Sequence, residues 1–238
     1  MHRAVISACF VTSASSLMSP VRTRLLLASN FVDPSTFWRC LDTQRHSFVE
    51  SSHAKTPVTL LYVPTASLWL DPDSTSTRSL GKRRQRARAS LKKNMQAVVA
   101  SLSDRSDSDA TSGSVDSKAP SSSPPDNRGI EAQWLDVGDP AVNAAAVKDA
   151  VTRADCVYVE GGNTFWLAHH MRRTGFRDAL QAACSTNVLP DGRKGVFQGK
   201  DPLYIGISAG AIVAGKSIAP ALWKGSVRYC SYACSYCQ

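Results

Sequence analysis

Short apolar runs alternate with longer amphipathic stretches along this chain. Five runs predict buried strands: residues 21–29, 58–63, 133–137, 156–159 and 203–205. Between them, helical spacing of apolar side chains predicts helices over residues 34–49, 80–102, 139–151 and 164–184. Strands that alternate with helices are typical of an α/β fold with a mainly parallel sheet. The continuous apolar character of residues 58–63 suits a sheet covered on both faces, so we expect a three-layer sandwich.

Residues 103–129 interrupt this pattern, because they contain almost no apolar side chains and are rich in serine, aspartate and proline. Such a segment cannot offset an ordering entropy of about 1–2 kcal/mol per residue, which predicts a disordered insert. We expect limited proteolysis to cut there first. The folded domain is therefore expected over residues 21–225, with this insert inside it.

Residues 1–20 form an N-terminal extension without any acidic residue, in which His2 and Arg3 precede many serines and alanines. This composition is typical of an organelle transit peptide. An unstructured start, or an upstream methionine chosen in error, is the equal alternative. The chain has seven cysteines, an odd number that suits reduced thiols inside a cell. Apart from organelle targeting, we therefore expect a cytoplasmic protein.

The net charge of +9 comes largely from one stretch of the predicted helix over residues 80–102. Seven cations without an acid lie there: Lys82, Arg83, Arg84, Arg86, Arg88, Lys92 and Lys93. A nuclear signal or a nucleic-acid patch would explain them, but no aromatic side chains interleave for base stacking. We favour a solvated helix face and no nucleic-acid partner. No run reaches the ~20 apolar residues that span a bilayer, so no membrane partner is expected either.

A G-x-S-x-G pattern follows the last apolar run, where residues 206–210 read GISAG. This pattern is typical of a nucleophile elbow, a sharp strand-to-helix turn that exposes a serine hydroxyl. Gly206 and Gly210 suit the turn because larger side chains would collide there. The amide of Ala209 would face a developing oxyanion. The alternative for Ser208 is a structural turn between a buried strand and a packed helix.

A second strand, loop and helix precede the elbow. Residues 156–159 read CVYV, the turn signal GGN follows at residues 161–163, and Thr164 can cap the next helix. If the two strands are parallel neighbours, both loops lie at the carboxyl edge of one sheet. A glycine amide of this loop could then supply a second oxyanion donor.

The two motifs in this order resemble the dipeptidase E family, the aspartyl dipeptidases of peptidase family S51, with cyanophycinase more distant. The resemblance covers residues 21–225 with one insertion, and Glu160 stands where relatives often carry glycine. It implies a flavodoxin-like α/β sandwich related to class I glutamine amidotransferases, with serine in place of cysteine. It also implies Ser208 as the nucleophile, and the amides of Gly162 and Ala209 as the oxyanion hole. Asn163 and Thr164 become substrate-binding candidates.

The resemblance stops near residue 225. Residues 226–238 contain no acid and no apolar period, and they look like a translated intron or a frameshift. We therefore expect a C-terminally truncated chain that lacks the last strands, the family's histidine base and its orienting acid. His169 and His170 lie well inside a predicted helix and are more readily explained as packed or solvent-facing side chains.

Three cysteines of this tail, Cys230, Cys234 and Cys237, have the spacing of a radical S-adenosylmethionine iron–sulfur site. That site normally precedes a long domain, so chance is the better explanation here. No other cysteine or histidine cluster has metal-ligand spacing, and neither a metal nor a cofactor is expected.

Two functions are consistent with these observations. The first is a serine-type peptidase that hydrolyses short peptides, with an N-terminal aspartate as one option, through a Ser208 acyl-enzyme. The second is a catalytically inactive product, a truncated paralogue or a misread gene, that acts at most as a binding module. Because the base is missing, we expect residues 1–238 to show little or no peptidase activity. An amidotransferase-like module is disfavoured by the serine, and the sequence leaves the oligomeric state open.

Overall fold

A computed structural model describes residues 25–29, 32–45, 57–69, 77–103, 129–184 and 202–224 of the chain. The predictions for the N-terminal extension and for the tail after residue 225 lie outside these residues. Most of the predicted insert, residues 104–128, also lies outside them. None of the described helices is both long enough and apolar enough to cross a membrane.

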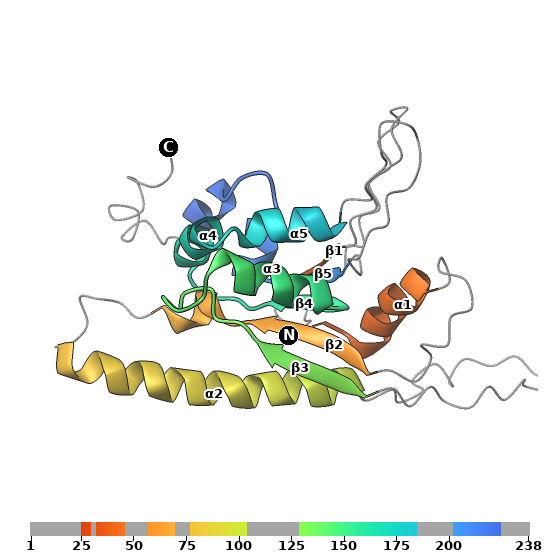
Figure 1. Cartoon of the computed structure of the whole chain (residues 1–238), viewed down its shortest axis with the longest axis horizontal. Helices are drawn as coiled ribbons and strands as arrows, with labels where there is room; N and C mark the ends of the chain where they lie inside the picture. Colours follow the sequence, from red (N-terminus) through yellow and green to blue (C-terminus); the bar gives the residue numbers. More distant parts are fainter. Residues whose placement is uncertain are drawn as a thin grey trace, which may run out of the picture.

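A five-stranded sheet forms the centre of the described chain, in the order β1-β5-β4-β2-β3 (Figure 1). The strands are β1 (Leu25–Ala28), β2 (Val58–Val63), β3 (Ile130–Trp134), β4 (Cys156–Val159) and β5 (Leu203–Ile207). Every pair is parallel, which confirms the predicted α/β class and sheet type. β5, the last of these strands in sequence, lies between the first strand, β1, and β4.

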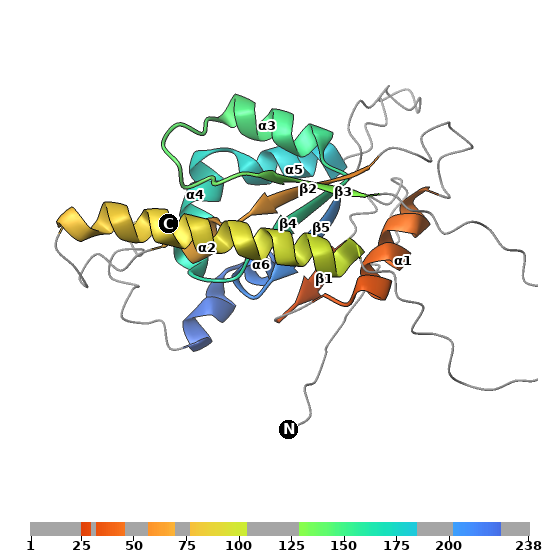
Figure 2. The same cartoon turned by 90° about the horizontal axis from the view of Figure 1, so that it is seen from below.

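Helices cover both faces of this sheet and make a three-layer sandwich, as the apolar strands predict (Figures 1 and 2). The first face carries α3 (Ala144–Arg153), α4 (Thr164–Arg173) and α5 (Phe176–Cys184). The second face carries α1 (Pro34–Arg45) and α2 (Thr77–Ser103). Alternate residues of one strand enter the two cores, because successive side chains of a strand point to opposite faces.

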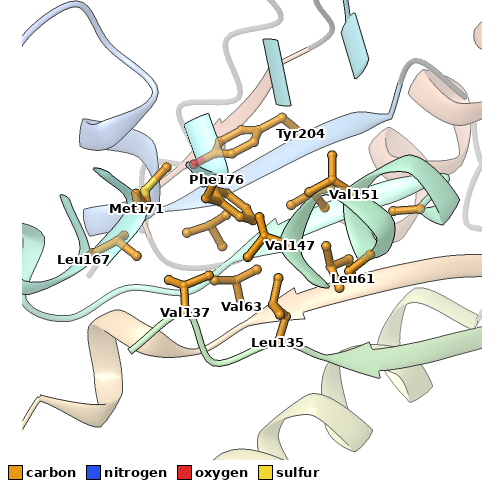
Figure 3. Packing of buried hydrophobic residues seen from close by; sticks show 14 of the residues in the cluster. Leu61, Val63, Leu135, Val137, Val147, Val151, Leu167, Met171, Phe176 and Tyr204 are labelled. Atoms are coloured by element: carbon orange, nitrogen blue, oxygen red, sulfur yellow. The ribbon is translucent and has the colours of Figure 1, made fainter. Parts of the chain in front are cut away.

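The packing of the first face is shown in Figure 3. Leu61 and Val63 of β2 meet Val147 of α3, Leu167 of α4 and Phe176 of α5 in one cluster. On the second face, fully buried aromatic and aliphatic side chains of α1 and of the sheet make the other cluster. Burying one such side chain stabilises the fold by roughly 1.5–3 kcal/mol. The two cores therefore hold the carboxyl edge of the sheet rigid from both sides.

The predicted strands β2 and β4 have the bounds that the sequence indicates, whereas β3 does not. β3 was expected over residues 133–137 and is Ile130–Trp134 instead. The chain leaves the sheet where Asp136 turns back, because its carboxylate accepts hydrogen bonds from the Gly138 amide (2.9 Å) and from the Thr65 hydroxyl (3.0 Å). Hydrogen bonds to one aspartate, from a residue two positions ahead and from one 71 positions away, thus end the strand early.

The two helices that follow also differ from the prediction. The helix expected from residue 139 begins at Ala144, because Asn143 caps it by accepting the Ala146 amide at 2.9 Å. The helix expected over residues 164–184 is broken into α4 and α5 at Gly175, whose φ of +66° suits glycine. These breaks are short-range effects that helical periodicity alone does not reveal.

The remaining elements agree with the prediction apart from their ends. β1 is described over Leu25–Ala28, while residues 21–24 of its expected range lie outside the described chain, and β5 extends to Ile207. α2 is longer than the expected 80–102 at both ends. α1 is described to Arg45, and the last residues of its expected range lie outside the described chain.

Candidate active site

Ser208 lies directly after β5, at the carboxyl edge of the sheet, and begins α6 (Ala209–Val213). Its backbone has φ 49° and ψ −99°, and it is the one non-glycine residue with positive φ in the described chain. Its amide donates to the carbonyl of Ala28 in β1 at 2.9 Å, and its carbonyl accepts the Ile212 amide at 3.0 Å. A strained conformation costs about 1–3 kcal/mol and persists only where neighbouring bonds hold it.

The two glycines of the GISAG turn are required by space. A Cβ on Gly206 would lie 2.7 Å from the carbonyl carbon and oxygen of Gly210. A Cβ on Gly210 would lie 2.3 Å from the carbonyl oxygen of Val159 in the neighbouring strand. The expected collision of larger side chains in this turn is therefore confirmed.

The GGN loop follows β4 and lies beside the elbow, because β4 and β5 are parallel neighbours. A Cβ on Gly161 would lie 3.2 Å from the Cβ of Ser208 and 3.9 Å from its Oγ. Gly162 has φ +135°, and a Cβ there would lie 2.3 Å from the carbonyl oxygen of Ala66. Only glycine fits this close approach of two loops without strain.

A third segment, the short 3-10 helix η1 (Thr65–Leu68) after β2, completes this edge. The Asn163 amide donates to the Ala66 carbonyl at 2.9 Å, and the Ser67 hydroxyl donates to the Gly161 carbonyl at 2.5 Å. This segment thus joins the GGN loop and Ser208 at the carboxyl edge of the sheet, which we call the rim. These hydrogen bonds join the segments after β2 and β4, and the loop after β4 in turn lies against Ser208.

The other predicted site residues have distinct surroundings. No described residue accepts a hydrogen bond from the backbone amide of Gly162 or of Ala209. The cap of α4 is Asn163 rather than Thr164, since the Asn163 side chain accepts the Trp166 amide at 3.0 Å. Thr164 is buried. The Asn163 side-chain oxygen is thus already bonded within the protein. The substrate-binding roles of Asn163 and Thr164 stay predictions.

The described residues include two histidines, His169 and His170, and both belong to α4. His170 is buried, and its Nδ1 accepts a hydrogen bond from the Arg173 guanidinium at 3.2 Å. Its ring packs edge-on against Trp166 and against His169, with centroids 4.1 Å and 4.9 Å apart. Burial, with His169 and Arg173 nearby, lowers the pKa of His170 to about 4. His170 is therefore a packed, neutral side chain at pH 7.

This burial predicts a pH-dependent stability. The folded pKa of about 4 lies below the ordinary 6.5, so the unfolded chain takes up the proton first as the pH falls. The stabilisation is complete above about pH 6.5 and is lost towards pH 4, by about 2–3 kcal/mol. We expect the unfolding free energy of His170→Gln to decline less than that of the wild type between pH 7.5 and 5, measured by urea denaturation. Parallel declines would contradict this prediction.

A buried polar cluster that the sequence analysis missed lies at the same sheet edge. Asp136 is only 3% exposed and accepts from Arg88 at 3.1 Å, besides its bonds to Thr65 and Gly138. Arg88 also pairs with Asp139 at 2.8 Å, and both carboxylates raise its pKa. One member of the basic run on α2 thus pairs with a buried carboxylate, although 37% of its side chain stays exposed. An aspartate inside the strand predicted over residues 133–137 was the available signal.

Glu160, the departure noted in the sequence, follows β4 directly. Its Oε2 accepts a short hydrogen bond from the hydroxyl of Tyr62 in β2. Burial raises the pKa of Glu160, whereas the bond from Tyr62 acts in the opposite direction. Tyr62 is fully buried, and burial raises its pKa as well. Within the described residues, no group of three or more histidine, cysteine or acidic side chains could hold a metal ion.

Comparison with known proteins gives a match to a protein family and a similarity to solved structures. Residues 127–229 match the model of peptidase family S51. The crystal structure of a candidate peptidase E protein from Listeria monocytogenes EGD-e is similar, with 21% sequence identity and a TM-score of 0.40. The match covers 82% of this chain and 63% of that protein, so the chain spans less than two thirds of its relative's length. No curated protein sequence matches the chain.

Proposed function

We propose that this chain carries the nucleophile machinery of a serine-type peptidase for short peptides, because residues 127–229 match the model of peptidase family S51. The substrate class follows the aspartyl dipeptidases that the motifs resemble. The observation that carries the proposal is the strained backbone of Ser208, φ 49°, at the end of a central strand. Strain of this kind is concentrated at functional sites, where it aims a reacting group.

In the proposed reaction, the Ser208 hydroxyl attacks the scissile carbonyl, the peptide C–N bond breaks, and the C-terminal part of the peptide leaves as an amine that takes up the hydroxyl proton. Water then hydrolyses the acyl-enzyme, which releases the N-terminal part as an acid and restores the hydroxyl. The amides of Gly162 and Ala209 stabilise the oxyanion. Both residues belong to loops at the carboxyl edge of the sheet, and neither amide donates a hydrogen bond to another described residue. Fixed donors at a developing charge act strongly because they need no reorganisation during the reaction.

Neither of the described histidines is proposed as the general base. His170 is buried, its Nδ1 is occupied by Arg173, and its lowered pKa makes it a weak base. His169 belongs to the same helix, α4, more than one turn from its start.

The second candidate is a catalytically inactive binding module built on the same rim. It is favoured by the surroundings of His170, which is buried and whose Nδ1 already accepts a hydrogen bond from Arg173. In this case the rim binds a peptide without cleaving it. Peptide binding without acylation is the property that separates this candidate from the first.

Detection of the acyl-enzyme tests the proposal. Residues 1–225, extended with the C-terminal portion of a family S51 peptidase, are mixed with aspartyl dipeptide esters and quenched in acid. Mass spectrometry is expected to find the aspartyl adduct on the peptide that contains Ser208. An adduct on another residue, or hydrolysis without any dependence on Ser208, would contradict the proposal. Peptide binding without an adduct would support the binding module.

A further inference from the structure

Glu160 is a carboxylate that the proposed reaction does not use, and it directly precedes Gly161, whose backbone approaches the nucleophile. It stands between Val159, the last residue of β4, and Gly161. The backbone of Gly161 approaches Ser208 so closely that a Cβ on the glycine would lie 3.9 Å from Oγ. The Glu160 amide donates to the Val63 carbonyl at 3.0 Å. The backbone of Glu160 is therefore fixed to β2, one residue from the loop that contacts the nucleophile.

The side chain of Glu160 is also held in place. Its Oε2 accepts from Tyr62, and the Tyr62 ring stacks on Tyr158 with centroids 5.5 Å apart and planes 9° apart. Trp134 packs on the other side of Tyr62 at 5.9 Å. A row of three aromatic rings from three strands thus fixes the carboxylate. A side chain held this firmly loses little entropy when it binds a ligand.

The carboxylate lacks a cation within the described chain. No described arginine, lysine or histidine forms a salt bridge with Glu160, and no described residue donates to its Oε1. The side chain is only partly exposed, so its charge is incompletely hydrated. A partly buried carboxylate without a cation favours a ligand that brings one.

Short peptides bring such a cation to this place. If the first peptide bond is cleaved, the α-ammonium nitrogen is two bonds from the scissile carbonyl carbon, about 2.5 Å away. That carbon must approach the Ser208 hydroxyl to within about 3–3.5 Å before reaction. The ammonium group therefore lies within a few ångströms of the nucleophile, in the neighbourhood of the loop that begins at Glu160.

We infer that the Glu160 carboxylate is a specificity determinant that binds a primary ammonium group of the peptide next to Ser208. This inference rests on the proposed peptide-binding function of the rim. The ammonium group comes either from the free N-terminus or from a lysine side chain, which share the same chemistry. A substrate carboxylate in the same position is repelled by Glu160.

The test uses the full 238-residue chain and isothermal titration with four probes: Ala-Ala, Lys-Ala, norleucyl-Ala and N-acetyl-Ala-Ala. If Glu160 binds the N-terminus, acetylation is expected to weaken binding about tenfold, the ratio typical of one charge-assisted hydrogen bond. If it binds a side chain, Lys-Ala is expected to exceed norleucyl-Ala by a similar ratio. Wild-type affinities that are equal for all four probes would overturn the inference.

Matched variants test whether Glu160 causes the preference for the probe that carries the ammonium group. In Glu160→Gln, the preferred and the disfavoured probe are expected to bind alike, whereas Tyr62→Phe retains the carboxylate and part of the preference. Glu131→Gln removes an exposed carboxylate from β3 and is expected to change nothing. A preference that survives in Glu160→Gln would overturn the inference. Acylation of Ser208 together with an unchanged preference would leave the proposed function intact, whereas absence of both acylation and peptide binding would remove both.

Discussion

Replacement of Ser208 by alanine is expected to lower peptide hydrolysis by about 10⁴–10⁶-fold in any active form of this chain. The expected loss is large because the hydroxyl forms the bond to the acyl group, and removal of a nucleophile leaves only the contribution of binding and of the oxyanion donors. Folding should change little, since the backbone bonds of Ser208 to Ala28 and Ile212 do not use the hydroxyl. The rate is measured by release of aspartate from aspartyl dipeptides, with residues 1–225 extended as for the acyl-enzyme experiment.

Ser217→Ala is the matched control for this substitution. The Ser217 side chain lies outside the rim and accepts the Ala219 amide at 3.1 Å. We expect its removal to leave the rate within about twofold and the stability within about 1 kcal/mol. Retention of full activity by Ser208→Ala, with both proteins folded by circular dichroism, would refute the nucleophile assignment.

Gly162→Ala is expected to destabilise the fold by about 3–5 kcal/mol. The new Cβ would lie 2.3 Å from the Ala66 carbonyl oxygen and 2.8 Å from the Ser67 nitrogen. These are backbone atoms that cannot turn away, and φ +135° adds conformational strain for any L side chain. A loss of this size corresponds to a fall in melting temperature of roughly 10 °C for a chain of this length.

Gly81→Ala provides the opposite control. Gly81 lies within α2, and a Cβ there has nothing within 4 Å. Alanine should therefore stabilise the protein by about 0.5–1 kcal/mol through its higher helix propensity. Thermal unfolding followed by circular dichroism compares the two variants. If Gly162→Ala melts within 2 °C of the wild type, the close approach of the two loops does not exist in solution.

The sequence alone predicted those features of the fold and of the candidate site that one short segment determines. The run of residues 58–63 predicts a doubly covered strand because nearly every position is apolar, and all but one of its residues are buried. The GISAG turn predicts a close approach because two glycines flank a serine, and both glycines abut backbone atoms. The parallel pairing of β4 and β5, which was only a condition in the sequence analysis, is observed in the structure. The catalytic roles of these residues remain predictions.

The features that the sequence did not predict depend on contacts between residues that are distant in sequence. Tyr62 and Glu160 are 98 residues apart, and Thr65 and Asp136 are 71 apart, so no local pattern links them. The early end of β3 has the same origin, because the carboxylate of Asp136 binds a residue from another strand's loop. A single sequence shows which residues are polar, but not which of them share one edge of a sheet.

The central position of β5 has a consequence for synthesis of the chain on the ribosome. Until residues 203–207 emerge, β1 and β4 lack the neighbour that pairs with both of them. The nascent sheet then exposes two unpaired strand edges, the kind of surface that pairs with other chains. The Ser208 amide also finds its acceptor, Ala28, only when the last described strand has inserted. Assembly of the elbow is therefore a late, long-range event, and release before residue 203 is expected to give aggregating fragments.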